Sequence, residues 1–459
     1  MRGLHWLAAS SFVFLAACGS YTGDKDKGDF SDAVAILNPE DQVLPDPEFA
    51  GQPVAIPPAT ENMVWPQVAG GPSHAIGHVA APFTLERQWR TAAYSRKARG
   101  APVTSAPAVS ETSLFVIDAI GSVVAIDIAT GDETWRTTLT PDVRDENVRA
   151  WNIFAKIDPK DLGFGGGVAL ANGRVFVTSG FGFVAALDAG TGELLWQIDT
   201  PSPTRNPPTV ANGLVIAVTI SNQVIAYDQQ TGDEVWSYES FEESARFLAS
   251  AAPAVEGESV VVPFSSGEIV SLSRTNGRVL WQAVIARTSR LNALSTFGDI
   301  AGSPVIDRGA VFTVSQAGQM AGIDLRTGNV AWEQPVGGQN LPWVAGETIY
   351  VLSNRGSLTA LNRVDGRVRW TAELPLWRNP DKRKKRRTWS GPVLAGGKLY
   401  LSGSERELVA VDPQNGEIID EYRLKEGSTQ PPVVAQGMLF VITDDGFIEA
   451  FGAAPFELQ

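Results

Sequence analysis

Cysteine and histidine are scarce in this chain of 459 residues, which contains one cysteine and three histidines. A single cysteine excludes a disulfide within the chain. Basic residues are also in deficit, 37 against 51 acidic ones, and the formal net charge of -14 argues against non-specific binding to nucleic acid or to anionic lipid. No nucleic-acid partner is therefore expected.

The lone cysteine closes an apolar N-terminal segment, MRGLHWLAASSFVFLAAC. The segment carries a basic Arg2 and is too short to span a membrane comfortably, which is typical of a secretory signal. Its end, LAAC, resembles the bacterial lipoprotein signal, in which the cysteine is lipidated and becomes the first residue. The resemblance implies a signal peptide at 1–17 and a lipid anchor on Cys18. Because no Asp follows Cys18, the resemblance also implies transfer to the outer membrane, facing the periplasm.

The segment 18–82 lacks regular periodicity and is rich in Pro, Gly, Ala and Asp. This composition predicts a flexible tether, with short docking segments around Met63 to Trp65. His74 and His78 lie four residues apart, but Gly77 interrupts the segment and no helical register holds there, so no metal site is expected.

A ten-residue phrase recurs from here to the C-terminus. LDAGTGELLW at 187–196 returns, slightly altered, as IDIATGDETW, YDQQTGDEVW and IDLRTGNVAW. Eight units follow one another at intervals of roughly 40 to 60 residues, the spacing of a four-stranded propeller blade. They align on the small residues Ala125, Ala186, Ala226, Ser271, Gly322, Ala360, Ala410 and Ala450.

Each unit reads as four strands. A Pro opens the first, a β-branched or aromatic run forms the second, and a Thr-Gly or Asn-Gly turn joins the third to the fourth. A tryptophan four residues after that glycine marks the fourth strand, and Asp420 breaks the rule in the seventh unit. These structural tryptophans are Trp135, Trp196, Trp236, Trp281, Trp332 and Trp370.

The eighth unit ends before its tryptophan, whereas Trp89 stands upstream of the first unit in a strand with no blade of its own. We therefore predict an all-β fold over 83–459. It is an eight-bladed β-propeller of four-stranded antiparallel blades, in which the N-terminal strand closes the last blade.

The recurring phrase resembles the tryptophan-docking motif of quinoprotein dehydrogenases, which bind pyrroloquinoline quinone with a calcium ion and commonly carry a vicinal disulfide. No Cys-Cys pair exists here. The lipoprotein signal, the tether and eight such repeats together resemble the BamB family, lipoprotein scaffolds of the outer-membrane β-barrel assembly machinery. That resemblance implies a non-catalytic role without a cofactor or small-molecule substrate. Its implied partners are the POTRA domains of BamA and the other Bam complex subunits.

Long connections between blades are where a partner is expected to bind. One offers Arg246 beside the apolar Phe247 and Leu248, and the next ends with Asp299. The resemblance implies that these loops dock BamA, although an acidic residue expected two positions after Asp299 is Ala301 here.

A basic run at 382–387 stands out in this acidic chain. We interpret it either as a solvated loop or as an electrostatic contact with lipid head groups or an acidic POTRA surface. Its members are Lys382, Arg383, Lys384, Lys385, Arg386 and Arg387.

The sequence thus predicts a lipid-anchored assembly scaffold and not an enzyme. Two alternatives remain, a quinone-dependent dehydrogenase and a propeller that binds envelope glycans.

Overall fold

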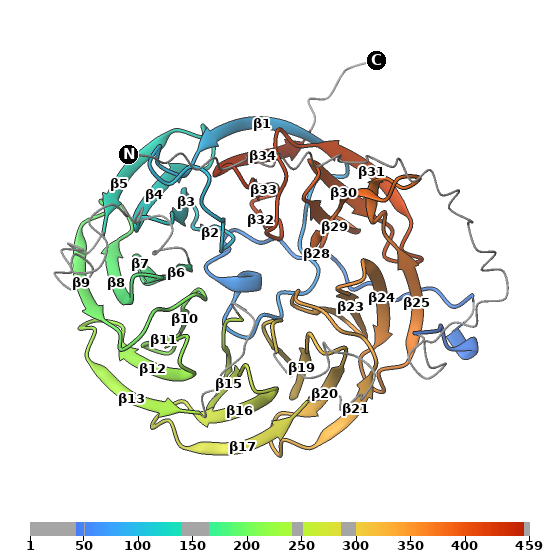
Figure 1. The fold of residues 1–459 in the computed structure, drawn as a ribbon, viewed down its shortest axis with the longest axis horizontal. Coiled ribbons are helices and arrows are strands. Elements are labelled where there is room, and N and C mark those ends of the chain that lie inside the picture. The colour runs from blue at the N-terminus through green and yellow to red at the C-terminus, as the bar shows by residue number, and fades with distance from the viewer. Residues whose placement is uncertain (1–42, 50, 140–164, 241–250, 286–299, 454–459) are drawn as a thin grey trace, which may run out of the picture. The chain divides into compact units, whose positions relative to one another are not determined.

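The computed structural model describes residues 43–49, 51–139, 165–240, 251–285 and 300–453. Eight four-stranded antiparallel sheets form the blades of one β-propeller (Figure 1). We number the blades 1 to 8 in chain order. The predicted fold class is confirmed. In the described part of the chain, no helix is long and apolar enough to cross a membrane.

Every blade runs from its innermost to its outermost strand in chain order, except the last. Blades 1 to 4 comprise β2 (Ala108–Val109), β3 (Ser113–Ile117), β4 (Ser122–Asp127), β5 (Glu133–Thr138); β6 (Gly166–Ala171), β7 (Arg174–Ser179), β8 (Phe183–Asp188), β9 (Leu194–Asp199); β10 (Thr209–Ala211), β11 (Leu214–Val218), β12 (Gln223–Asp228), β13 (Glu234–Glu239); and β14 (Ala254–Glu256), β15 (Ser259–Pro263), β16 (Glu268–Ser273), β17 (Val279–Val284). Blades 5 to 8 comprise β18 (Val305–Asp307), β19 (Ala310–Val314), β20 (Met320–Asp324), β21 (Val330–Gln334); β22 (Trp343–Ala345), β23 (Thr348–Leu352), β24 (Ser357–Asn362), β25 (Val368–Glu373); β28 (Trp389–Ala395), β29 (Lys398–Gly403), β30 (Glu407–Val411), β31 (Ile418–Arg423); and β32 (Val433–Ala435), β33 (Met438–Ile442), β34 (Phe447–Ala453), β1 (Leu85–Ala92). Outside the blades lie the 3-10 helices η2 (Pro47–Phe49) and η3 (Val68–Gly70) and the hairpin β26 (Trp377–Asn379) and β27 (Lys384–Arg386).

The repeated phrase builds the turn between the third and fourth strands. In blade 2, Asp188 Oδ1 accepts the backbone N–H and the hydroxyl of Thr191 at 2.8 and 3.0 Å. These bonds hold the pKa of the Asp188 carboxyl below its usual range. The same Asp–Thr contacts recur in Asp228 and Asp324, with the same direction of pKa shift. The turn is therefore fixed by its own side chains.

Each tryptophan of the fourth strand packs on the turn glycine of the following blade. A Cβ atom at Gly192 would lie 2.5 Å from the ring of Trp135, so only glycine leaves room for the indole. The indole N–H of Trp135 donates to Ala189 O at 3.0 Å in the same turn. Equivalent N–H donations join the other tryptophans to carbonyls of the following blade, from Trp89, Trp196, Trp236, Trp281, Trp332 and Trp370. The motif thus joins one blade to the next.

The exception at Asp420 follows from the closure of the ring. Blade 8 joins β34, from the C-terminal end, to β1, from the N-terminal end, so no turn links its third and fourth strands. Blade 8 therefore offers no turn glycine on which a tryptophan from the fourth strand of blade 7 could pack. Asp420 instead pairs with Lys398 at 2.6 Å, and the same ammonium donates to Phe83 O at 2.7 Å just before β1.

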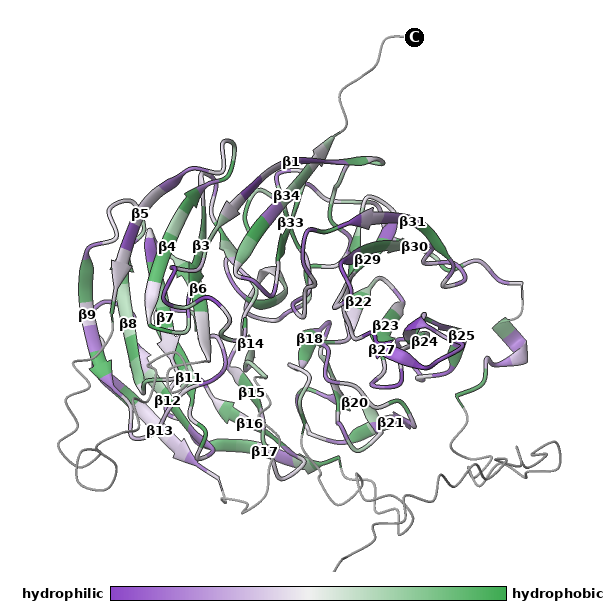
Figure 2. Ribbon diagram, turned by 45° about the horizontal axis from the view of Figure 1, so that its top comes forward, coloured by the Kyte–Doolittle hydropathy of each residue, from purple (hydrophilic) through white to green (hydrophobic). Residues whose placement is uncertain are grey.

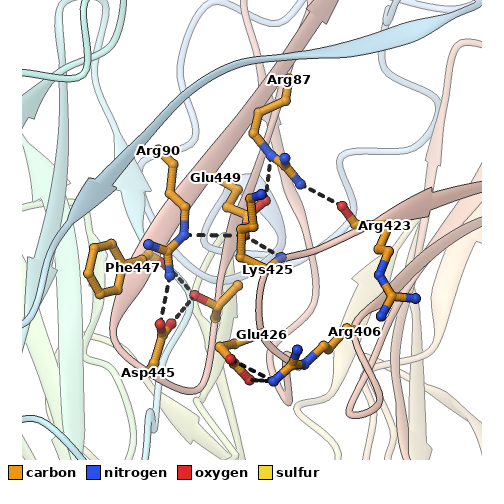
Figure 3. A network of polar contacts seen from close by, with 10 residues as sticks. Arg87, Arg90, Arg406, Arg423, Lys425, Glu426, Asp445, Phe447 and Glu449 are labelled. Carbon is orange, nitrogen blue, oxygen red and sulfur yellow. Dashed lines mark hydrogen bonds and ion pairs between the residues drawn. The ribbon is translucent and has the colours of Figure 1, made fainter.

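A buried carboxylate fastens this closure (Figure 3). Glu449 on β34 is fully buried and pairs with Arg87 at 2.7 Å and Arg90 at 3.4 Å, both on β1. It also accepts the backbone N–H of Lys425 at 2.8 Å. Arg90 makes a second ion pair with Asp445 at 2.6 Å. The two ends of the ring are therefore joined by charges as well as by the strand ladder.

Residues 60–80, which we call the inner strap, do not form the tether that the sequence predicts. They run through the middle of the ring (Figure 1) and contact the blades one after another. Trp65 pairs with Val109 of blade 1 through two backbone hydrogen bonds of 2.7 and 2.8 Å. The strap then accepts N–H groups from the innermost strands of blades 2, 4 and 5, at Leu170, Val255 and Ile306.

The strap also contacts the four remaining blades, 3, 6, 7 and 8. Gln67 exchanges two hydrogen bonds with Val210 of blade 3, and the strap carbonyl of Gly77 accepts the indole N–H of Trp343 in blade 6. Val79 pairs with blade 7, and Asn62 accepts an N–H from blade 8. The strap closes on itself because its two ends pair, Thr60 with Val79. It supplies partners to inner strand edges that would otherwise face the axis unpaired.

Candidate partner-binding face and axial cavity

One face of the ring carries the connections between blades, and we call it the loop face. In every blade except blade 5, the residue after the outermost strand donates its backbone N–H to the turn between the second and third strands of the same blade. Leu139 bonds to Gly121, Ser240 to Asn222, and Ile285 to Gly267, at 2.8, 3.1 and 2.9 Å. These turns and the connections therefore emerge together.

The predicted partner-binding residues Arg246, Phe247, Leu248 and Asp299 lie outside the described residues, in two of these connections. The ends of the two connections meet on the loop face, because Ala252 N donates to Ser303 Oγ at 2.9 Å. Cys18 and the signal segment 1–17 are likewise outside the described residues.

The basic run forms a hairpin on the loop face. Strands β26 and β27 pair Trp377 with Arg386 and Asn379 with Lys384, in the connection between blades 6 and 7. The side chains of 382–386 are exposed, and the hairpin is coloured hydrophilic in Figure 2. Among the described residues, no ion pair joins 382–386 to an acidic group.

Two ion pairs anchor the base of this hairpin to blade 7. Arg378 pairs with Glu405 at 3.2 Å and Arg387 with Glu407 at 2.9 Å. Arg387 N also donates to Leu376 O at 2.8 Å, and the Arg386 guanidinium donates to Asn354 O at 3.3 Å. The base of the hairpin is therefore held to blade 7, whereas the side chains at its tip, 382–385, are exposed.

A cavity of about 560 Å³ lies among the inner ends of the blades. Strap residues Trp65, Gln67, Val68 and Ala69 line one part of it, and Arg386 and Arg387 line another. The wall is completed by the start of β28, at Trp389 and Ser390, and by blade connections, chiefly through Ser105, Pro207, Ser303, Asn340 and Gln430.

The wall of this axial cavity has an uneven chemistry. Of the described residues, two arginines line it, and no Asp or Glu does. Trp65 and Trp343 stack on each other there, with ring centroids 6.1 Å apart and an interplanar angle of 13°. Trp389 is a third aromatic lining residue. The cavity therefore combines aromatic surface with positive charge.

The two histidines of the strap have structural contacts. His78 Nε2 accepts the N–H of Gly397 at 2.9 Å, and its Nδ1 lies 2.7 Å from Pro57 O. His74 is buried, and its Nδ1 lies 2.7 Å from Pro304 O. Within the described part of the chain, no three His, Cys, Asp or Glu side chains gather in a way that suits a metal ion.

We predict that His74 makes stability fall with acidification. Burial lowers its pKa to about 4, against the opposing effect of the hydrogen bond to Pro304, and Nε2 has no hydrogen-bond partner among the described residues. The unfolded chain binds a proton as the pH falls through about 6.5, whereas the folded chain binds it only near 4. The free energy of unfolding should therefore fall by about 2 to 3 kcal/mol between pH 7.5 and 4.5.

Urea unfolding at both pH values checks this prediction, with His74→Asn as the matched variant. His74 has a φ of 63°, a conformation that Asn tolerates. The variant should lose clearly less stability on acidification than the parent chain. Equal losses would assign the pH dependence to other groups.

A family-wide sequence profile, described as outer membrane protein assembly factor BamB, matches residues 75–150, 145–372 and 375–454. The chain belongs to the BamB family. The BamB protein of Yersinia pestis is 26% identical over 346 residues, covering 75% of this chain and 83% of its relative. The Escherichia coli K12 protein is 27% identical over 343 residues, covering 74% and 82%.

Solved structures agree on the fold. BamB from Moraxella catarrhalis superposes with a TM-score of 0.62 at 19% identity, over 80% of this chain and all of that one. A europium-containing methanol dehydrogenase superposes with a TM-score of 0.67 at 15% identity, over 86% and 98%. The propeller is thus common to an assembly factor and to an oxidoreductase, and fold alone does not separate their functions.

The site separates them better. Calcium prefers carboxylate ligands, and the described residues that line the cavity include no Asp or Glu. Sequence reasoning found the loop face but missed the cavity and the strap. Isolated apolar residues at Val54, Trp65 and Val79 were the available signal, since each is buried inside a Pro- and Gly-rich stretch.

Proposed function

We propose that this protein is a non-catalytic scaffold in the assembly of outer membrane proteins, held to the outer membrane by a lipid on Cys18 and facing the periplasm. Membership of the BamB family carries the proposal. The closed ring, in which each blade is joined to the next, supports the proposal, because a rigid platform holds binding loops at fixed positions. A dehydrogenase role is disfavoured by the chemistry of the cavity wall.

The partner that we propose is BamA, bound through its periplasmic POTRA domains with the other Bam subunits nearby. Arg246, Phe247, Leu248 and Asp299 are the proposed contacts. An arginine beside two large apolar residues is the composition expected of an interface anchor. The meeting of Ala252 and Ser303 supports treating the two connections as one surface.

Co-purification from solubilised membranes tests this assignment. Replacing Phe247 and Leu248 together by Glu should reduce recovered BamA at least tenfold, because two buried charges would oppose the contact. The melting temperature should stay unchanged. A matched control replaces the exposed Val364 and Ile419 by Glu and should leave BamA recovery at the parent level. Full recovery of BamA with the Phe247 and Leu248 variant would remove this site.

The tip of the basic hairpin supports a second contact of electrostatic character. We propose that Lys382 to Lys385 approach lipid head groups, with an acidic POTRA surface as the alternative. Each exposed cation near an anionic leaflet contributes about 1 kcal/mol. Binding to anionic liposomes should weaken with salt and with neutralisation of 382–387. Liposome binding that survives neutralisation would assign the hairpin to the protein partner.

A further inference from the structure

We propose that the axial cavity and the base of the basic hairpin form a binding site for an organic carboxylate with a flat aromatic body. A carboxylate of this kind has two sources, a free small molecule and the C-terminus of a polypeptide that ends in an aromatic residue. The site goes beyond the scaffold role and does not depend on it.

Size and shape set the first limit on the ligand. A volume of about 560 Å³ lies within the range of sites that take drug-sized ligands. The inner strap supplies one part of the wall, and its hydrogen bonds to successive blades hold that wall in place. The cavity is therefore preformed.

Charge sets the second limit. The chain has a formal net charge of -14, yet no Asp or Glu is among the described residues that line this cavity. Arg387 is balanced by Glu407, whereas Arg386 has no acidic partner among the described residues and only donates to Asn354 O. Arg386 is the lining cation with unused donors, and guanidinium donors match a carboxylate. The exposed cations from Lys382 to Lys385 precede it along the hairpin and favour the approach of an anion.

Aromatic surface sets the third limit. Trp65, Trp343 and Trp389 contribute to the wall, together with the apolar Val68, Leu341 and Leu376. Side-chain amides at Gln339, Asn340 and Asn354 lie among the same lining residues. A flat apolar body thus finds aromatic partners, and its acid group finds Arg386 and amide donors.

Titration calorimetry with the full chain tests the site through matched probes. We expect 2-naphthoate to bind at least tenfold more tightly than 2-naphthamide, which has the same ring without the charge. Arg386→Gln should weaken binding of 2-naphthoate at least tenfold, and Arg386→Lys should restore most of it. Arg383→Gln removes the same charge from the hairpin tip, outside the cavity lining, and should change the affinity less than twofold.

Two peptides distinguish the sources. If the natural ligand is a polypeptide end, N-acetyl-Gly-Gly-Phe with a free carboxylate should bind more tightly than its amide. If the natural ligand is a small molecule, 2-naphthoate should bind more tightly than the peptide. Equal binding of naphthoate and naphthamide, or equal effects of the two Gln variants, would overturn the proposal. So would the absence of binding by every probe at millimolar concentration. The calorimetry uses the isolated chain without BamA, so a negative result here leaves the scaffold role untouched.

Discussion

Replacing Glu449 by Ala should lower the free energy of unfolding by about 3 kcal/mol, because it removes one partner of a buried ion-pair group. The Glu449 side chain is fully buried, whereas those of Arg87 and Arg90 are 29% and 24% exposed. Without the carboxylate, two half-buried guanidinium groups lose the acidic partner that they share, and Lys425 N loses its acceptor. Asp445 still pairs with Arg90, which limits the loss.

Urea and thermal unfolding measure this effect, and Glu347→Ala provides the control. Glu347 pairs with Arg308 at 2.6 Å, but both side chains are about half exposed, at 49% and 51%. Losing an exposed pair should cost less than about 1 kcal/mol. Proteolysis should also release β1 preferentially in Glu449→Ala, since β1 is the strand that the carboxylate holds. Similar losses in the two variants would mean that the strand ladder alone closes the ring.

The fold was predictable from sequence because each repeat carries its own contacts. The Asp and Thr of one phrase bond within one turn, and the glycine meets the tryptophan of the preceding blade, so the local pattern determines the neighbouring contact. Even the exception has a local cause, since Asp420 occupies the one slot that faces a blade without a turn glycine.

The strap was not predictable in this way. It is held by backbone groups at irregular intervals, such as Pro66 O and Pro72 O, which bond to strand edges in different blades. Such contacts impose no period on the sequence, and the composition of the strap matches that of a linker. The cavity was hidden for a related reason: Ser105, Asn340 and Gln430 line one wall but lie far apart in the chain.

Replacing Trp65 by Ala should lower the free energy of unfolding by about 3 to 5 kcal/mol, the range for loss of a large buried aromatic side chain. Trp65 is only 3% exposed and stacks on Trp343 of blade 6, while its backbone pairs with Val109 of blade 1. Trp65 therefore links two blades, blade 1 through its backbone and blade 6 through its side chain. Its removal should also loosen the strap, because Trp65 holds the backbone from which the neighbouring strap residues make their own contacts.

Met63→Ala is the matched control, because Met63 lies two residues away in the same strap but is 52% exposed. Its replacement should change stability by less than about 0.5 kcal/mol. Urea unfolding of both variants distinguishes a packed strap from a tether. If residues 60–80 were a tether, neither side chain would contribute to the stability of the ring. A large loss in Trp65→Ala alone requires the strap to be part of the folded propeller. If neither variant lost stability, residues 60–80 would be the linker that their composition predicts.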